Sequence, residues 1–109
     1  DATDIEGVLD AARLGDTSAS FALRVTGQSM RDAGILDGDY VLVQTTSDVR
    51  NGEIVVAMIG EETTVKRFER KGTRVLLNPE NQEYEPIVVT ARSPELRILG
   101  KVVGVYREY

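Results

Sequence analysis

Two residues in this sequence carry groups that together could cleave an acyl bond. Ser29 lies within residues 27–30 (GQSM), and Lys66 lies within residues 64–68 (TVKRF). The chain contains neither histidine nor cysteine, so a histidine-dependent triad and a thiol nucleophile are both excluded. A serine hydroxyl could be activated here only by a lysine, a carboxylate or a metal ion. Serine with a lysine base is an established solution for acyl transfer, so the sequence offers one candidate for each role.

Ser29 is predicted to lie on a tight turn between a strand and a short helix. Residues 21–25 have the pattern of a strand, Gly27 interrupts it, and residues 29–33 could form the helix. Backbone N–H groups at a helix start favour negative charge, so those of Gln28 and Ser29 could form an oxyanion hole. Serine is also a favoured N-cap residue, and most such turns do no chemistry, so the turn alone does not identify a nucleophile.

Lys66 is predicted to lie within a strand, on a face that also carries an aromatic residue. Because side chains alternate along a strand, Thr64, Lys66 and Phe68 share one face, whereas Val65 and Arg67 lie on the other. An amine on an apolar face loses solvation, and only a neutral amine can accept a proton from a hydroxyl. The alternative is a lysine whose stem lies along the sheet and whose charged head reaches water.

The rest of the chain predicts an all-β, mainly antiparallel domain with one short helix after the nucleophile. Short apolar segments separated by glycine-containing turns are typical of such domains. The expected strands are 21–25, 40–43, 54–59, 63–68, 74–77, 87–90 and 96–106. Residues 1–20 are polar and mixed, with a weak helical stripe at Ile5, Val8, Leu9 and Ala12. We therefore expect a lead-in segment over 1–20 with one helical turn, followed by a single domain over 21–109.

Composition and charge exclude several classes of function. The 109 residues carry a formal net charge of −5, which argues against this domain binding a phosphate backbone by itself. The absence of cysteine excludes disulfides and thiolate metal sites, and no metal or cofactor is indicated. No apolar segment reaches membrane-spanning length, so we expect a cytoplasmic protein with no membrane partner.

Two smaller features allow more than one interpretation. Asp37 and Asp39 flank Gly38, and turn chemistry with solvation explains them. The apolar residues within 102–106 could pair with another chain through an exposed strand edge, or could belong to the core. The sequence does not decide between these two roles for residues 102–106.

Several short motifs follow one another along the chain, namely residues 27–30 (GQSM), 37–39 (DGD), 51–57 (NGEIVVA), 64–67 (TVKR), 78–81 (NPEN), 86–89 (PIVV) and 100–105 (GKVVGV). Several motifs in one order are far more specific than one motif alone, and here they extend over nearly the whole chain. In content and order, these motifs resemble the C-terminal domain of LexA-type repressors, which are self-cleaving serine–lysine peptidases. The family also includes UmuD-like polymerase subunits and phage repressors.

The resemblance implies a LexA/signal-peptidase-like β fold with a shallow active-site cleft, Ser29 as nucleophile and Lys66 as general base. In such proteins a loop carrying an Ala-Gly bond enters the cleft and is cut in the same chain, promoted by a RecA filament on single-stranded DNA. Cleavage separates a DNA-binding helix-turn-helix half from this half and lifts repression of genes for the SOS response and DNA repair. The peptidase half also holds the homodimer together, and DNA is bound only through the other half.

Two family features are missing from the sequence. It has no helix-turn-helix segment, and its one Ala-Gly pair, Ala33-Gly34, follows Ser29 and matches the end of the short helix. The start at Asp1 is expected of a fragment, either a cleavage product or a designed piece. We therefore expect that this chain cannot cut itself at the family site, and that it acts in trans or serves to dimerise.

Two alternatives use the same residues differently. A processed UmuD-like accessory subunit of a translesion DNA polymerase would work through its surfaces, with the serine–lysine pair already spent. A signal-peptidase-like enzyme would need a membrane anchor or a membrane-facing apolar surface, and neither is visible. By resemblance, residues 102–106 favour the LexA-type repressor domain, a serine endopeptidase, and the sequence preceding Asp1 would discriminate between repressor and polymerase subunit.

Overall fold

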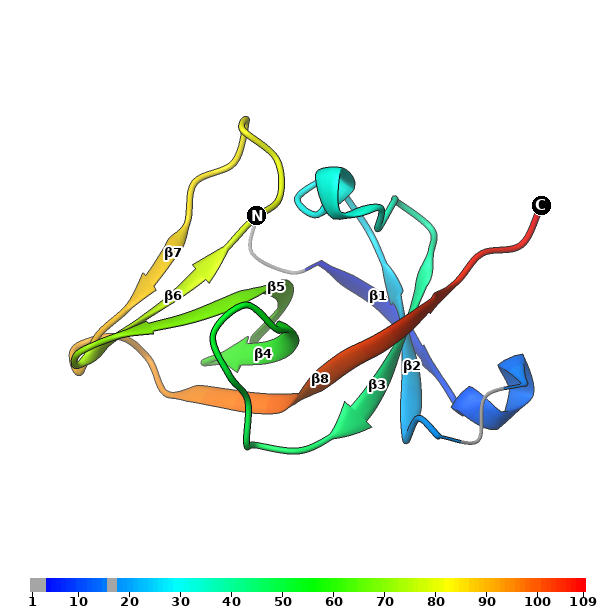
Figure 1. Ribbon diagram of the computed structural model, residues 1–109, viewed down its shortest axis with the longest axis horizontal. Helices are drawn as coiled ribbons and strands as arrows, with labels where there is room; N and C mark the ends of the chain where they lie inside the picture. Colours follow the sequence, from blue (N-terminus) through cyan, green and yellow to red (C-terminus); the bar gives the residue numbers. More distant parts are fainter. Residues whose placement is uncertain (1–3, 16–17) are drawn as a thin grey trace.

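The computed structural model describes residues 4–15 and 18–109, which form one curled antiparallel sheet (Figure 1). Within these residues the sheet has eight strands in the spatial order β1-β2-β3-β8-β4-β5-β6-β7. The long strand β8 lies between β3 and β4 and joins the two halves of the sheet. The strands are β1 (Ile5–Leu9), β2 (Phe21–Val25), β3 (Tyr40–Thr45), β4 (Ile54–Ile59), β5 (Glu62–Lys71), β6 (Arg74–Asn78), β7 (Ile87–Val89) and β8 (Leu96–Tyr106).

The predicted all-β class is confirmed, but the first strand was not foreseen. Residues of β1 form a strand that pairs with β2, with Val8 opposite Leu23 and Leu9 opposite Ala22. Long-range pairing with an available strand therefore overrides the weak helical stripe. In the described part of residues 1–20, helical geometry is confined to the 3-10 helix η1 (Ala11–Leu14), whose first turn is capped by the side chain of Asp10.

The helix after the nucleophile is shorter than predicted. It is the 3-10 helix η2 (Arg31–Ala33), and its N-cap position is Met30, which makes no side-chain capping bond. Ser29 therefore lies outside the helix, and its expected alternative role as an N-cap is wrong. Gly34 ends the helix as predicted, with a φ of 84° that favours glycine.

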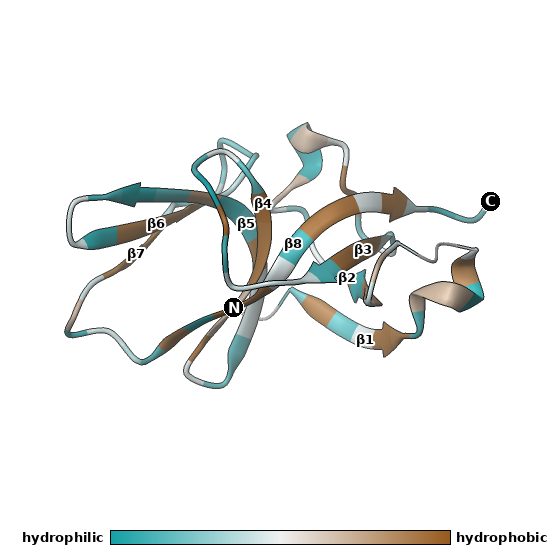
Figure 2. Ribbon diagram, turned by 60° about the horizontal axis from the view of Figure 1, so that its bottom comes forward, coloured by the Kyte–Doolittle hydropathy of each residue, from teal (hydrophilic) through white to brown (hydrophobic). Residues whose placement is uncertain are grey.

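The curl of the sheet separates two hydrophobic clusters, and β4 and β5 contribute to both. Val56 and Val65 pack in the first cluster, against residues of β2 and β3, whereas Val55 and Phe68 pack in the second, against β6 and β7. Figure 2 shows the apolar residues along β4 and β8. Alternation along β5 thus buries both of its faces, which explains how a lysine on this strand can be buried.

Strand β8 needs a glycine where it crosses β3. A Cβ atom at Gly100 would lie 2.5 Å from the backbone oxygen of Gln44 and 2.6 Å from a methyl group of Val43. Strand β4 pairs with β8 only as far as Lys101, whereas β3 pairs with it up to Tyr106. Among the described residues, the end of β8 therefore has a strand on one side only. Within residues 4–15 and 18–109, no helix is long and apolar enough to cross a bilayer.

Candidate active site

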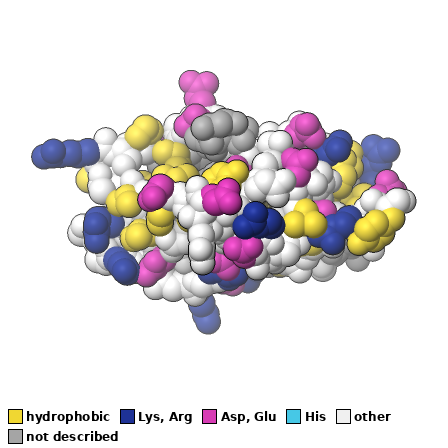
Figure 3. Space-filling view, turned by 90° about the horizontal axis from the view of Figure 1, so that it is seen from above, with side chains coloured by type: hydrophobic (Ala, Val, Ile, Leu, Met, Phe, Trp, Pro, Cys, Tyr) yellow, Lys and Arg dark blue, Asp and Glu magenta, His cyan; other side chains and the backbone are white. Residues whose placement is uncertain are grey.

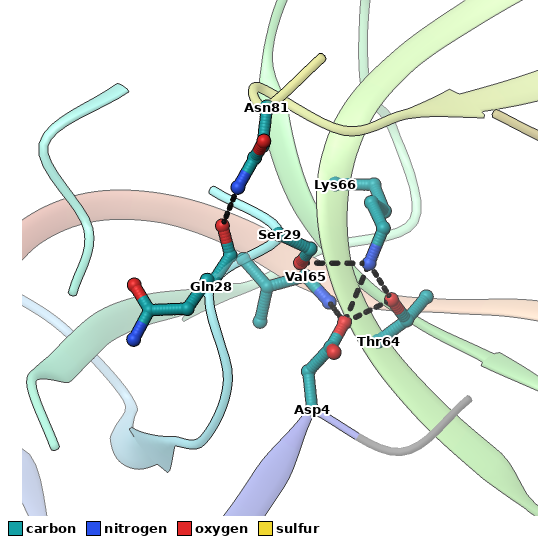
Figure 4. A network of polar contacts seen from close by, with 7 residues as sticks. All are labelled: Asp4, Gln28, Ser29, Thr64, Val65, Lys66 and Asn81. Atoms are coloured by element: carbon teal, nitrogen blue, oxygen red, sulfur yellow. Dashed lines mark hydrogen bonds and ion pairs between the residues drawn. The ribbon is translucent and has the colours of Figure 1, made fainter. Parts of the chain in front are cut away.

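The fold brings the two predicted site residues into direct contact. Ser29 lies in the segment between β2 and β3, and Lys66 lies in the middle of β5. Their Oγ and Nζ atoms are 3.1 Å apart (Figure 4). Each residue is only 5% exposed, so the alternative in which the lysine head reaches water is wrong. A hydroxyl and an amine at this distance can exchange a proton directly.

Lys66 is held by two further oxygen atoms. Its Nζ lies 2.6 Å from Oδ2 of Asp4 and 2.5 Å from Oγ1 of Thr64. With the Ser29 oxygen, these partners place three oxygen atoms around Nζ, as many as the amine has N–H donors when it is protonated. The amine is therefore held in one position beside the Ser29 hydroxyl.

Asp4 is the site residue that the sequence did not reveal. Its carboxylate also accepts from the Thr64 hydroxyl and from the Val65 N–H. Its backbone is fixed as well, because its N–H donates to the Thr63 carbonyl and its carbonyl accepts from Thr26. The only available sequence signal was an acidic residue directly ahead of an apolar one, and that pattern is too common to identify a site.

The turn that carries Ser29 is tied to the loop after β6, residues 79–86. The side-chain amide of Asn81 donates to the Gln28 carbonyl at 2.8 Å, and the Glu80 N–H donates to the Ser29 carbonyl at 2.8 Å. Gly27 donates its N–H to Asp37 at 2.7 Å. In the described part of the chain, no acceptor is found for the N–H groups of Gln28 or Ser29. These two donors are the ones expected from the sequence to hold an oxyanion, although they precede η2 rather than begin it.

A hollow of about 330 Å³ adjoins the serine and the lysine. Besides Asp4, its walls include Glu62, Glu85, Tyr84 and Ile87. Figure 3 views the molecule from above and shows acidic, basic and apolar side chains interspersed over that face. Three carboxylates and one lysine line the hollow, so it is acidic, and the Tyr84 ring and Ile87 add apolar surface. Among the described residues, no cluster of acidic side chains is arranged to hold a metal ion.

A second ion pair fixes the end of the segment between β2 and β3 that lies farther from Ser29 in the sequence. Asp39 is 2% exposed, and its two carboxylate oxygens accept from Nε and Nη2 of Arg107 at 2.7 and 2.6 Å. Arg107 also donates to the Gly34 carbonyl at 3.0 Å. The expected solvated turn residue is therefore a buried ion-pair partner, because the C-terminal segment folds back across the turn.

This contact changes the acidity of the Asp39 carboxyl. The hydrogen bonds from Arg107 hold the pKa of Asp39 below its ordinary value of 3.8, and the Leu36 N–H acts in the same direction. Burial opposes them, because it disfavours the charged carboxylate. The same hydrogen bonds raise the pKa of Arg107, so both partners stay charged throughout the neutral range.

Together, the curled sheet and the buried contact define an all-β domain with a serine and a lysine joined in an acidic cleft. Residues 4–103 match the Peptidase S24-like family, and the chain belongs to this family. It is similar to the LexA repressors of two strains of Histophilus somni, with 58% identity over 90 residues, which covers 82% of this chain and 43% of each relative. It is 57% identical to the LexA repressor of Hahella chejuensis over 90 residues, which covers 83% of this chain and 45% of that relative.

These comparisons confirm the resemblance to LexA-type repressors that the motifs predicted. The chain spans less than half the length of the curated relatives that it matches. What these relatives do as whole proteins therefore bears on this chain only as a proposal.

Proposed function

We propose that this chain is the peptidase and dimerisation domain of a LexA-type SOS repressor. It acts as a serine endopeptidase on an Ala-Gly bond, with Ser29 as nucleophile and Lys66 as general base. The observation that carries the proposal is the 3.1 Å contact between their side chains in a buried cleft. A solvated surface lysine need not lie near any particular hydroxyl, whereas a base must lie within hydrogen-bond reach of the proton that it removes.

The reaction follows from this geometry in two stages. The neutral Lys66 amine takes the Ser29 proton while Oγ attacks the scissile carbonyl carbon, and the N–H groups of Gln28 and Ser29 hold the oxyanion. The tetrahedral intermediate then collapses, the C–N bond breaks, and Lys66 returns the proton to the leaving amine. In the second stage, water attacks the ester on Ser29, and Lys66 takes the proton of the water and passes it to the serine oxygen.

The contact with Asp4 sets a condition on this reaction. The Asp4 carboxylate lies 2.6 Å from the amine, and an amine that is protonated while it contacts this carboxylate cannot act as a base. The chemical step therefore needs Lys66 to lose a proton, so cleavage should accelerate as the pH rises. The Thr64 hydroxyl, which contacts both Lys66 and Asp4, keeps the amine directed along the strand toward Ser29.

The proposed partners follow from the resemblance, with one supporting observation in the fold. The end of β8 has a strand on one side only among the described residues, and its Val103 and Val105 side chains are exposed. An apolar strand with a free edge is suited to pairing with a second copy of the chain, which supports the homodimer. We further propose stimulation by a RecA–single-stranded DNA filament in the cytoplasm, and DNA binding only through a helix-turn-helix half outside this sequence.

Cleavage in trans tests the proposed peptidase activity. The chain is mixed at mildly alkaline pH with a peptide that carries an Ala-Gly site, beside the variants Ser29→Ala and Lys66→Ala. We expect cleavage by the parent and by neither variant, with Lys71→Ala, an exposed lysine at the end of β5, as the matched control that stays active. If the folded parent leaves the peptide intact, or if both site variants still cleave it, the proposal is wrong.

A further inference from the structure

The loop after β6 reaches across to the turn that carries the nucleophile, and one of its side chains is buried there. We infer that Asn81 is a positioning residue for the oxyanion site, whose side-chain amide holds the Gln28 carbonyl so that the Ser29 N–H faces the cleft. The inference deepens the proposed peptidase function and rests on it. Asn81 itself touches neither the nucleophile oxygen nor the lysine, so any effect on catalysis must act through the backbone.

The contacts of Asn81 are directional at both ends of its amide. Nδ2 donates to the Gln28 carbonyl at 2.8 Å, whereas Oδ1 accepts from the Glu83 N–H at 3.0 Å and from Arg31 Nη2 at 3.4 Å. The residue is 6% exposed. Because Oδ1 faces two donors, the reversed orientation of the amide would place NH₂ against N–H groups. The amide is therefore held with its donor toward Gln28.

The geometry of a peptide group turns this contact into a constraint on Ser29. In a trans peptide the C=O and the following N–H point in opposite directions, and no cis peptide occurs among the described residues. With its carbonyl bonded to Asn81, the peptide between Gln28 and Ser29 must direct the Ser29 N–H away from Asn81. Figure 4 shows Asn81 on one side of this peptide and Asp4, at the floor of the site, on the other.

The orientation of this peptide matters because the opposite orientation would destabilise the oxyanion. If the peptide rotated, the Gln28 carbonyl would present a partial negative charge where the oxyanion develops, and one donor would be lost. The Arg31 N–H also donates to the Gln28 carbonyl, but at 3.2 Å, so the Asn81 contact is the shorter of the two. The neighbouring Ser29 carbonyl is held separately by Glu80, so changing Asn81 leaves the turn attached.

The variant Asn81→Asp isolates the donor. It keeps the size of the side chain and the acceptor for Glu83 and Arg31, but it replaces the N–H donor with an oxygen facing the Gln28 carbonyl. We expect kcat for trans-cleavage of the Ala-Gly peptide to fall at least about tenfold, toward the roughly 10²–10³-fold cost of losing an oxyanion donor. KM should stay close to that of the parent, since the substrate contacts remain. The melting temperature should fall, because a buried oxygen then faces the Gln28 carbonyl, but the Glu80 bond keeps the turn attached.

The matched control is Asn51→Asp. Asn51 lies in the turn before β4, and its amide also donates to a backbone carbonyl and accepts from a backbone N–H, both of Arg70. The substitution makes the same chemical change away from the cleft, and it should leave kcat unchanged. A second measurement uses Ser29→Ala with and without Asn81→Asp, and compares binding of the uncut peptide by fluorescence anisotropy. Equal affinities would show that Asn81 acts on the reaction and not on substrate binding.

Each outcome of this experiment separates the inference from the function on which it rests. A parent that cleaves the peptide, with an Asn81→Asp variant of equal kcat, would overturn the inference and leave the proposed peptidase intact. A variant with an altered KM or a lower melting temperature but an unchanged kcat would show a structural role, which also overturns it. A folded parent that never cleaves would overturn both.

Discussion

Two buried carboxylates each pair with a cation, at opposite ends of the segment that carries Ser29. Asp39 is held by Arg107 through two hydrogen bonds, and Asp4 contacts Lys66 through one. An arginine keeps its proton under all ordinary conditions, whereas a buried lysine can lose it. The choice of cation suits the two ion pairs to different roles. The arginine pair fixes the turn, whereas the proposed reaction needs a lysine that can give up a proton and take it back.

The largest expected effect on the rate of trans-cleavage comes from replacing Lys66 with arginine, so that its pair with Asp4 resembles the pair of Asp39 and Arg107. Lys66→Arg preserves a positive charge for Asp4 but cannot supply a neutral base. We expect trans-cleavage to fall by about 10²–10⁴-fold, the usual contribution of a general base, while circular dichroism still reports a folded β protein. An active Lys66→Arg variant would contradict the assignment of Lys66 as base. Lys71→Arg, on the exposed end of the same strand, serves as the control.

A smaller effect is expected from weakening the contact that holds the lysine amine. Asp4→Asn keeps a side chain of the same size beside Lys66 but replaces the carboxylate that lies 2.6 Å from Nζ with a neutral amide, which is a weaker partner for the amine. We expect a several-fold lower rate of trans-cleavage at neutral pH, because the amine is held less firmly beside Ser29. The Thr64 hydroxyl remains as a partner of Lys66 and limits the loss. A cleavage rate identical to that of the parent would show that Asp4 does not position the lysine.

Loss of the pair between Asp39 and Arg107 should change how the stability of the fold depends on pH, and it should leave the cleavage activity unchanged. Because the native pKa of Asp39 is lowered from 3.8, its charged form stabilises the fold at pH values above 3.8. That contribution is lost as the pH falls through the lower native value. Urea denaturation should therefore show Asp39→Asn to be less stable than the parent at neutral pH, with the difference shrinking in acid below the ordinary pKa. A stability difference that stays constant from pH 7 to pH 2 would contradict the predicted pH dependence.

The smallest expected effect is the exchange of Arg107 for lysine. Arg107→Lys retains a cation near Asp39 but loses the planar pair of donors and the further bond to Gly34. We expect a drop of several degrees in the melting temperature, and a cleavage rate per folded molecule close to that of the parent. A loss of activity as large as that of Lys66→Arg would show that the two ion pairs do not have separate roles.

The parts of the site that could be predicted from the sequence are those fixed by local pattern. Alternation along one strand placed Lys66 on the face of Phe68, and both residues are buried. Gly27 and Gly34 marked the limits of the turn around Ser29. The strands from β2 onward followed from their apolar residues and from the glycines between them, because local propensity and the final pairing agree there.

The residues that sequence reasoning missed owe their roles to contacts between distant segments. Asp4 lies 62 positions from Lys66, Asn81 lies 53 positions from Gln28, and Arg107 lies 68 positions from Asp39. Each is an ordinary polar residue in its local segment, so nothing within a short window indicates burial or a partner. Strand β1 was missed for the same physical reason, since only pairing with β2 makes it a strand.

The most direct test of the central claim is whether Lys66 activates Ser29. A fluorophosphonate reagent that reacts with activated serines can be followed by intact mass and peptide mapping, without any substrate loop. We predict a single adduct at Ser29 in the parent, formed faster as the pH rises, with the rate strongly reduced in Lys66→Ala while Lys71→Ala reacts like the parent. Labelling of Ser29 at the same rate in Lys66→Ala, or no labelling of the folded parent at any pH, would contradict the account.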